Sequence, residues 1–411
     1  MHSNEDCKAQ PYLLHNQIQH YAWGSRGATS FIPQLLGIAH DADTPYAELW
    51  MGAHPKASSV VHRGSTTATL KDWVQQQPHA ILGTRVAAAF DGQWPFLFKI
   101  LSIAAPLSIQ AHPNRSQAQA LHARDPEHYP DANHKPEIAI ALDSLTALVG
   151  FKEFAGIVTT LHTYPEIAAF IGSQATVRQA TTMTPSTQRE AVRHIYTTLM
   201  RRAIADTNDL THAIDQLASR LAQASTHTGH ERLFLTARQT YKGADVGLFA
   251  LFFLNLVHLK RGQGIFLAPG IPHAYVKGNI VECMANSDNV VRVGLTPKFK
   301  DVDTLVDILT YELGAPPILE PLPATHVVNY PAPVPEFSVR RLRLSTGMRQ
   351  THKRPETPAI WLITEGTIQL DWGTESATFK RGQSVLLPAI LREVTVTALQ
   401  DAEVFLAGVP M

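Results

Sequence analysis

The pattern of apolar and polar positions divides the chain into three regions. From about residue 10 to residue 150, short apolar stretches are broken by glycine and proline, which predicts a β-rich region. From about residue 151 to residue 240, apolar residues recur every three or four positions, as on the buried face of a helix. The residues with this spacing are Val192, Ile195, Leu199, Leu210, Ile214, Leu217 and Leu221. Short strands with tight turns are predicted again after residue 245.

Polar segments mark the predicted boundaries. The stretches "TTMTPSTQ" (181–188) and "ASTHTGHE" (224–231) are interpreted as connectors between helices. Gly314 to Pro335 holds seven prolines and is interpreted as an extended arm or linker. We therefore expect a mainly β fold with a helical insert. Its domains would be 1–150 together with 241–325, a helical domain at 151–240, and a C-terminal domain at 326–411.

Two segments of the chain resemble each other. "KRGQGIFLAPGIPHAYV" begins at Lys260 and "KRGQSVLLPAILREVTV" at Lys380, and with one residue skipped His273 faces Arg392. A charged turn, an apolar strand and a Pro-Gly bend followed by histidine are typical of the second half-motif of a cupin-type β-barrel. The repeat predicts two cupin-type (jelly-roll) barrels. Only the first would keep a histidine able to bind metal, and the second would be structural.

Length and composition narrow the class of protein. A chain of 411 residues predicts two or three domains. Lysine plus arginine equals aspartate plus glutamate at 35 each, so no net charge attracts nucleic acid or an anionic membrane. An anionic ligand must then be bound by a few placed cations. Two cysteines, Cys7 and Cys283, are too few for a disulfide framework or a cysteine-built metal site.

Targeting and membrane signals are also weak. "MHSNEDCKAQ" lacks an apolar core and carries acids, unlike a signal peptide. The longest apolar run, "VGLFALFFLNLVHL" (246–259), is too short to span a bilayer. We expect a soluble cytoplasmic protein with no membrane and no nucleic-acid partner.

Candidate chemistry begins in "PLSIQAHP" (106–113). Strand alternation puts Ser108, Gln110 and His112 on one face, so Gln110 and His112 can reach one point. The alternative is the exposed polar face of an edge strand. Together with Glu137 and His273, these residues offer two imidazoles, a carboxylate and an amide oxygen, which suits a zinc-like ion with room for a substrate oxygen. The absence of thiolates favours a catalytic metal over a structural one.

Spacing alone does not assemble this set, because the 20 histidines allow others, including His122, His128 and His134. Longer motifs do. The quoted segments are "YAWGSRG" (21–27), "AELWMGAHP" (47–55), "SIQAHP" (108–113), "YPDANHKPE" (129–137), "PGIPHAY" (269–275) and "GNIVECMANSDNVVRVGLTPK" (278–298). They resemble, in order, the signature segments of type I phosphomannose isomerases.

The resemblance implies a set of site residues. The family's metal ligands fall on Gln110, His112, Glu137 and His273. It also implies one zinc ion per chain, a catalytic arginine at Arg292 and an active-site lysine at Lys135. One departure is Arg115, where many relatives have lysine, and a cation is kept there.

The resemblance further implies reversible interconversion of D-mannose 6-phosphate and D-fructose 6-phosphate, with a proton moved from C2 to C1 through a cis-enediol. Lys135, beside the ligand Glu137, is a candidate base with a lowered pKa; the alternative is a salt bridge to Glu137 or Asp131. Arg292 suits phosphate or enediolate, with a structural ion pair as its alternative.

Other roles stay open in the sequence. Glu282 and Asp288 are carboxylate candidates that the sequence does not rank. His134 suits either ring opening or a hydrogen bond that orients a ligand. Lys99 is one charge inside an apolar strand and must face a polar cavity. We expect Lys99, Ser108 and Arg115 to contact the phosphate.

Two other functions fit parts of the sequence. Histidines with a carboxylate also suit iron(II) in a metal-dependent cupin oxygenase. A non-catalytic sugar-phosphate-binding cupin would keep the cavity without the reaction. "NHKPE" and "ECMANSDNVVR" count against the oxygenase, and Lys135 with Arg292 counts against the binding module. In each case the partner is a small molecule, and we expect a monomer.

Overall fold

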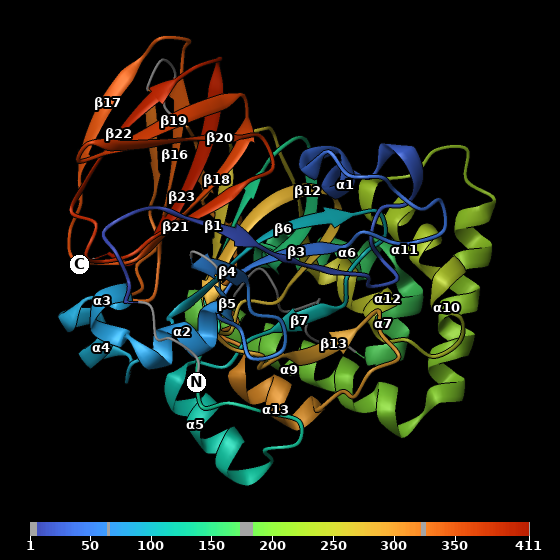
Figure 1. Cartoon of the computed structure of the whole chain (residues 1–411). Helices are drawn as coiled ribbons and strands as arrows, with labels where there is room; N and C mark the ends of the chain where they lie inside the picture. Colours follow the sequence, from blue (N-terminus) through green and yellow to red (C-terminus); the bar gives the residue numbers. More distant parts are fainter. Residues whose placement is uncertain (1–5, 64–65, 173–183, 322–325, 411) are drawn as a thin grey trace.

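A computed structural model describes residues 6–63, 66–172, 184–321 and 326–410 (Figure 1). Within them, strands predominate and helices gather to one side. The strands are β1 (Tyr12–His15), β2 (Gln17–Gln19), β3 (Glu48–Gly52), β4 (Val60–Arg63), β5 (Thr66–Thr69), β6 (Phe96–Ile103), β7 (Ile109–Ala111), β8 (Glu137–Ala141), β9 (Leu145–Phe151), β10 (Leu254–Leu259), β11 (Gly264–Leu267), β12 (His273–Ala285), β13 (Val291–Gly294), β14 (Ile318–Leu319), β15 (Val327–Tyr330), β16 (Ser338–Leu344), β17 (Arg349–Lys353), β18 (Ala359–Glu365), β19 (Thr367–Trp372), β20 (Glu375–Lys380), β21 (Ser384–Leu387), β22 (Glu393–Ala398) and β23 (Ala402–Gly408).

The helices lie mostly in the first and middle parts of the chain. They are α1 (Phe31–Leu36), α2 (Leu70–Gln76), α3 (Pro78–Leu82), α4 (Thr84–Ala89), α5 (Arg115–Arg124), α6 (Phe154–Thr163), α7 (Pro165–Ile171), α9 (Pro185–Ala205), α10 (Thr207–Ala222), α11 (Gly229–Thr240), α12 (Gly247–Ala250) and α13 (Val302–Ile308), with 3-10 turns at Gly27–Thr29 and Leu251–Phe253. The mainly β fold with helices is therefore confirmed. No helix in the described ranges is both long and apolar enough to cross a membrane.

Strand β12 organises the first sheet. It is 13 residues long, and its two halves pair with different neighbours. The first half pairs with β7 and β9, and the second half with β6 and β8. One continuous strand therefore fixes the positions of His273 at its start and Glu282 near its end.

The C-terminal strands form an eight-stranded sheet and a four-stranded sheet, at the upper left of Figure 1. The larger sheet has the order β15-β16-β23-β18-β21-β1-β4-β5, so strands from the beginning of the chain complete it. Leu13 of β1 pairs with Val385 of β21. The two ends of the chain are thus joined by backbone hydrogen bonds.

Strand pairing repeats along the chain. The series β7-β12-β9-β10 recurs as β17-β22-β19-β20, and β3-β6-β12-β8-β11 recurs as β15-β16-β23-β18-β21. The two similar segments of the sequence are β11 with the start of β12 and β21 with β22. Their likeness therefore reflects equivalent places in two sets of strands.

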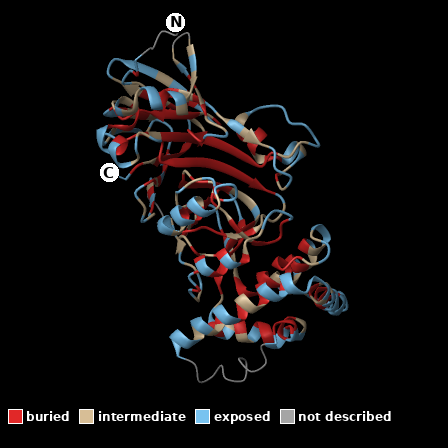
Figure 2. Ribbon diagram, turned by 90° about the horizontal axis from the view of Figure 1, so that it is seen from below, coloured by how far each residue is buried: buried red, intermediate tan, exposed pale blue. Residues whose placement is uncertain are grey.

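The predicted helices between residues 151 and 240 are confirmed. All seven periodic residues are buried, three on α9 and four on α10. In Figure 2 the buried sides of these helices face one another and the exposed sides face outward. The polar stretches interpreted as connectors also hold helix starts. Thr184 caps α9 ahead of Pro185, and Thr228 forms a capping box with Glu231 on α11, because caps favour polar residues. Residues 181–183 lie outside the described ranges.

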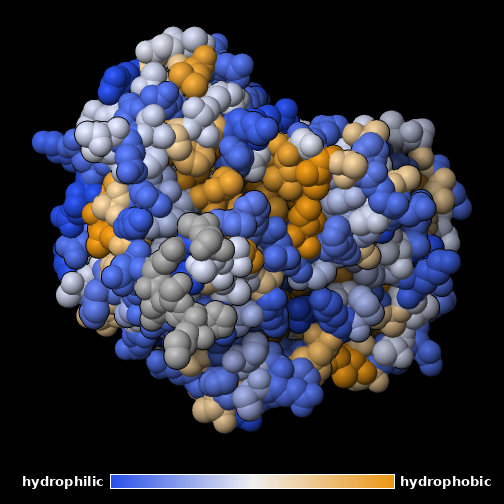
Figure 3. Space-filling model, viewed as in Figure 1, coloured by the Kyte–Doolittle hydropathy of each residue, from blue (hydrophilic) through white to orange (hydrophobic). Residues whose placement is uncertain are grey.

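The region predicted to be β-rich, 10–150, also holds α1 to α5. These helices are five to ten residues long, too short for a clear 3.6-residue period. The proline-rich segment contributes β14 to the first sheet and β15 to the second, and residues 322–325 are outside the described ranges. On the face in Figure 3, polar side chains predominate and apolar ones gather in a patch over the region of α1.

The strands β6 and β8 and the last six residues of β12, 280–285, are buried on both faces. One face is apolar and packs with the larger C-terminal sheet, for example Phe98 and Ile138 with Ile360 and Phe405. The other face carries charged residues among apolar ones. Buried charges are stable only when they are paired or bind a ligand, so this face is where a functional site is expected.

Candidate metal centre and active site

Three potential metal ligands converge inside the first set of strands. His112 directly follows β7, Glu137 begins β8 and His273 begins β12. Each is 1% exposed, and their ligand atoms lie within 4.8 Å of one another. Three strand ends thus bring together residues that lie far apart in the sequence.

The orientation of the two rings fits metal binding. Nδ1 of His112 donates to the carbonyl of Asn289 at 2.8 Å, and Nδ1 of His273 donates to the carbonyl of Ile271 at 2.9 Å. Since a carbonyl only accepts, both Nε2 atoms are left with a free lone pair. Nε2 of each ring and Oε2 of Glu137 are buried without a hydrogen-bond partner among the described residues. Buried acceptors are rarely unpaired, so the three atoms fit a bound cation.

Electrostatics support the same interpretation. Burial, and then the charge of Lys135, lowers the pKa of His112 to about 4, which keeps the ring neutral, as a ligand must be. Burial opposes ionisation of Glu137, but Lys135 and then His112 outweigh it and hold its pKa well below the usual value. The group therefore offers one anion, Glu137, and a neutral imidazole at His112.

Gln110 lies in the same row of residues. It pairs with His273 across β7 and β12, and with Arg292 across β7 and β13. The side chain of Gln110 is half-buried. The order His273, Gln110, Arg292 across three strands places the fourth predicted ligand between a ligand histidine and the predicted arginine.

Lys135 lies against the centre. Its Nζ is 2.9 Å from Oε1 of Glu137, and the residue is 8% exposed. The predicted alternative, a salt bridge to Glu137, is therefore present. Asp131 has other partners, because it accepts from the hydroxyl of Ser287 and the backbone of Asp288. Lys135 thus touches a candidate ligand rather than the supporting loop.

Lys99 and Glu282 form a second charged group on the same face. The Nζ of Lys99 lies 3.3 Å from a carboxylate oxygen of Glu282 and 3.3 Å from one of Glu48. All three residues are buried. Burial, and then the charge of Glu137, raises the pKa of Glu282. The predicted polar surroundings of Lys99 are therefore two carboxylates, and the sequence analysis missed Glu48 because its partner is on another strand.

The other predicted carboxylate is engaged differently. Asp288 lies 2.8 Å from Nζ of Lys56 and 3.3 Å from Nε2 of His54. Burial raises its pKa, but hydrogen bonds from His54 and Lys56 outweigh this and lower it. Asp288 stays ionised beside Lys56 and His54, and its lowered pKa leaves it a weaker proton acceptor than Glu282.

His134 and Arg115 meet on one buried carboxylate. Oε1 of Glu336 lies 2.7 Å from Nε2 of His134 and 2.6 Å from Nη2 of Arg115. Glu336 is 3% exposed and leads into β16. The loop next to Lys135 is thus anchored to the C-terminal part. Sequence reasoning missed Glu336, which lies just beyond the proline-rich segment and matches no motif.

Two cations have no counter-charge. Among the described residues, none is hydrogen bonded or ion-paired to the side chain of Arg292 or of Lys298. Burial, followed by the charge of Arg292, lowers the pKa of Lys298, so the two are close. Ser108, next to β7, is half-buried. Lys298 was missed, although it ends the long motif 278–298 and this position could have indicated it.

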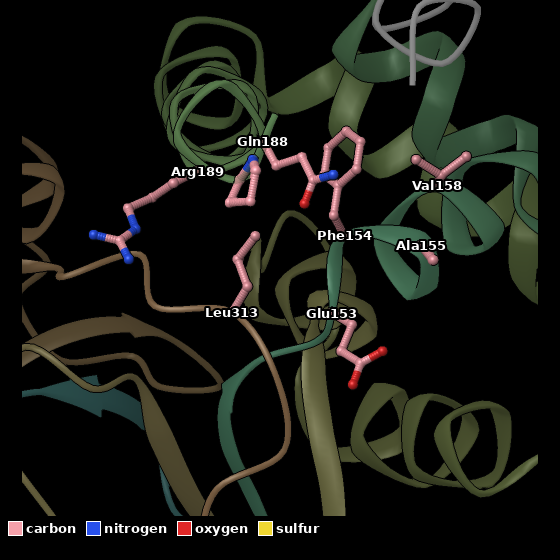
Figure 4. Close-up of a pocket in the computed structure, with 8 residues that line it drawn as sticks. Glu153, Phe154, Ala155, Val158, Gln188, Arg189 and Leu313 are labelled. Atoms are coloured by element: carbon pink, nitrogen blue, oxygen red, sulfur yellow. The ribbon is translucent and has the colours of Figure 1, made fainter. Parts of the chain in front are cut away.

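A separate hollow lies away from the metal centre. It has a volume of ≈ 650 Å³ and opens between α6 and α9, lined among others by Phe154, Val158, Arg189 and Leu313 (Figure 4). Glu153 and Arg189 point apart at its two sides. None of the predicted site residues lines it, so volume alone does not mark the site.

Comparison with known proteins agrees with the geometry. Residues 12–154 match the model of the phosphomannose isomerase type I catalytic domain. The chain is 39% identical to mannose-6-phosphate isomerase 2 of Arabidopsis thaliana over 95% of this chain and 92% of that protein. It is 39% identical to mannose-6-phosphate isomerase of Homo sapiens over 85% and 86%. The chain belongs to the mannose-6-phosphate isomerase family.

Solved structures of this family share the whole fold. A variant of phosphomannose isomerase from Salmonella typhimurium, in which an arginine is replaced by alanine, superimposes with a TM-score of 0.85 at 31% identity, covering 98% of this chain and 100% of that one. A mannose 6-phosphate isomerase bound with zinc and yttrium gives a TM-score of 0.84 at 31% identity. The family resemblance seen in the sequence is confirmed.

Proposed function

We propose that the chain interconverts D-mannose 6-phosphate and D-fructose 6-phosphate at the centre formed by His112, Glu137 and His273. The observation that carries the proposal is the meeting of these three buried ligand atoms with Lys135 at 2.9 Å from Glu137, in a chain of this family. An aldose–ketose isomerisation needs a stabilised enediolate and a proton moved between neighbouring carbons. A metal centre, a base and a free guanidinium supply these needs.

In this proposal, His112, Glu137, His273 and Gln110 hold one zinc ion per chain. Two neutral imidazoles, a carboxylate and an amide oxygen suit zinc, and no thiolate is among them. When bound, the ion supplies Lewis acidity at the substrate oxygens. The carbonyls of Asn289 and Ile271 fix the two rings for this purpose.

Proton transfer is assigned to Lys135 or Glu282. Lys135 is buried against the centre, and Glu282 is a buried carboxylate whose pKa is raised. Asp288 is held by Lys56 and His54, which makes it the weaker candidate. His134 is bonded to Glu336, which supports a positioning role over ring opening.

The substrate phosphate is assigned to Arg292, Lys298 and Ser108. Both cations lack counter-charges in the described chain, and an arginine binds phosphate through two parallel hydrogen bonds. Lys99 and Arg115 fit this task less well, because Lys99 has two carboxylates and Arg115 has Glu336. Lys99 then serves to hold Glu282 in place.

We also propose two cupin-type barrels, with the sequence-derived domains 1–150 plus 241–325, 151–240 and 326–411. The repeated pairing of β6–β12 in β16–β23 supports the barrels, although β1, β4 and β5 pair with the C-terminal strands. The protein is proposed to be cytoplasmic and monomeric, with a small sugar phosphate as its partner.

The test is a coupled assay for fructose 6-phosphate formed from mannose 6-phosphate, before and after removal of metal by a chelator. We expect turnover that is lost on chelation and restored by zinc. An iron-dependent cupin oxygenase would instead consume oxygen and respond to iron(II). A binding module would hold the sugar phosphate without turnover. Either result would contradict the proposal.

A further inference from the structure

The repeated pairing allows the C-terminal strands to be compared with the metal centre residue by residue. Glu137, the first residue of β8, pairs with Leu267, the last residue of β11. Ala359, the first residue of β18, pairs with Leu387, the last residue of β21. Ala359 therefore occupies the place of Glu137. The C-terminal part lacks the carboxylate of the candidate metal centre.

The C-terminal part keeps a cation at the position of Lys99, although it lacks the carboxylate at the position of Glu137. Lys99 on β6 pairs with Glu282 on β12. Glu282 pairs in turn with Ala139 on β8, which lies two residues after the candidate ligand Glu137. Arg340 on β16 pairs with Leu406 on β23. Leu406 pairs in turn with Trp361 on β18, which lies two residues after Ala359. Arg340 therefore occupies the place of Lys99.

The counter-charges of this cation are gone. Lys99 is neutralised by Glu282 and Glu48, and the place of Glu282 is taken by Leu406. Glu48 pairs with Leu101, two positions after Lys99, and Val327 pairs with Leu342, two positions after Arg340. Val327 therefore takes the place of Glu48. Two apolar residues thus replace two carboxylates. No described residue is hydrogen bonded or ion-paired to the guanidinium of Arg340.

A pocket of ≈ 250 Å³ lies at this position. Its lining includes Arg340, His352, Lys353, Arg354, Trp361 and Leu406. The described residues that line it include no acid. Two carboxylates close in sequence lie outside it: Glu356 pairs with Arg392 at 2.8 Å, and Glu393 lies opposite Lys353 at the start of β22. Lys353 thus has a carboxylate opposite it on the neighbouring strand, whereas no described carboxylate is paired with Arg340.

The inner wall of the pocket is preorganised. The guanidinium of Arg354 donates to the carbonyls of Thr357, Leu387, Pro388 and Leu391, which fix its position. The ring of His352 stacks edge-on against Trp361, with centroids 5.3 Å apart, and its Nε2 is buried without a partner among the described residues. Burial, and then Arg340 and Arg354, lowers the pKa of His352 to about 4, as expected beside uncompensated cations. Nε2 of His352 is thus available to bond a polar group of a ligand.

We propose that this pocket binds a small phosphorylated metabolite of about hexose-phosphate size, with Arg340 and Lys353 holding the phosphate. A guanidinium and a phosphate form parallel charge-assisted hydrogen bonds, and lysine adds a mobile charge at the rim, where it is exposed. The ring of His352 and the apolar wall at Leu406 receive the rest of the molecule. The site is separate from the metal centre, and its occupant carries the same chemical group as the proposed substrate.

The test is calorimetric titration of the full-length, zinc-loaded protein with inorganic phosphate, in the wild type, Arg340→Gln and the control Arg349→Gln. Arg349 is also a β-strand arginine of the C-terminal part, but it is paired with Asp371 outside the pocket. We expect two phosphate sites in the wild type and the control, and one in Arg340→Gln. Loss of charge-assisted hydrogen bonds weakens binding by roughly tenfold or more, while isomerase activity stays within about twofold.

Lys353→Gln removes an exposed charge of the same pocket and covers the case in which Arg340→Gln does not fold; it should weaken the same phosphate site. Crystals soaked in tungstate, read by anomalous scattering, should show an ion at Arg340. One phosphate site in the wild type, unchanged isotherms in both variants, or tungstate at the metal centre alone would overturn the proposal. Tighter binding of citrate than of phosphate at this site would overturn its assignment to a phosphorylated ligand.

Discussion

The ammonium of Lys135 and the carboxylate of Glu137 lie 2.9 Å apart, although Pro136 separates them in the chain. Oε1 of Glu137 lies 2.9 Å from Nζ of Lys135 and 3.4 Å from Nε2 of His112, while Oε2 lies 3.4 Å from Nε2 of His273. The carboxylate thus joins the candidate metal to the candidate base. Each residue has a distinct task that mutation can separate.

Lys135→Ala is expected to keep its metal and lose most of the rate. Lysine is not a ligand, and loss of a positioned acid–base group costs roughly two to four orders of magnitude. Zinc content by mass spectrometry and kcat measure the two effects. Lys135→Arg keeps the charge but cannot accept a proton at neutral pH, so it should also fail. A near-normal rate in Lys135→Arg would show that Lys135 is not the base and would leave Glu282 as the candidate. Lys260→Ala, in an exposed turn, is the control.

Removal of a ligand histidine is expected to abolish both metal content and turnover. His112→Ala and His273→Ala each remove one of three buried ligand atoms. Glu137→Ala should lose metal first, and added zinc should partly restore its activity, unlike that of Lys135→Ala. His122→Ala, whose ring bonds the carbonyl of Tyr129, is the matched control. Full activity in a metal-free preparation would contradict the assignment.

Arg292→Gln and Lys298→Gln are expected to raise KM for the sugar phosphate. No described residue is hydrogen bonded or ion-paired to the side chain of either cation, and a lost charge-assisted hydrogen bond to a ligand weakens binding by roughly tenfold or more. If Arg292 also stabilises the enediolate, kcat falls in that variant alone. Steady-state kinetics with Lys300→Gln as control separates the two effects. An unchanged KM in both variants would argue that the phosphate binds elsewhere.

Glu336→Gln is expected to lower the melting temperature at pH 7. Burial raises the pKa of Glu336, but His134 and then Arg115 outweigh it and lower it below the usual value. A lowered pKa means that the carboxylate stabilises the fold above about pH 4.3, the ordinary glutamate value, and that this is lost as pH falls through the lowered pKa. We expect a cost of about 1–3 kcal/mol at neutral pH.

This difference should shrink when unfolding is followed at decreasing pH. Glu312→Gln, an exposed site, is the control and should change little at any pH. An equal difference at pH 7 and at pH 3 would show that packing, not charge, explains the effect of Glu336→Gln.

Sequence reasoning succeeded where the signal is local. The periods on α9 and α10 and the alternation at Gln110 and His112 are read within a few residues. Lys99 was correctly expected to face polar groups, because one charge in an apolar strand needs them. The proposed set of four metal ligands needed the family resemblance, because spacing does not reveal that the strands bring together residues 112, 137 and 273.

What the sequence did not indicate depends on long-range contacts. Glu48 and Glu336 reach the site from other strands, and no spacing connects them to Lys99 or His134. Arg392 was interpreted as a structural replacement for a histidine. The residue is 57% exposed at its side chain and pairs with the exposed Glu356. Such pairs add little stability, so Arg392→Ala should change neither melting nor turnover much.

The pairing of β1 with β21 has a consequence for folding during synthesis of the chain. β1 is synthesised long before β21, because the two strands lie far apart in the sequence. Contacts of such high sequence separation form slowly, and an unpaired strand edge is prone to join other chains. One edge of β1 can pair early with β4, but the edge that pairs with β21 stays open until β21 has been synthesised.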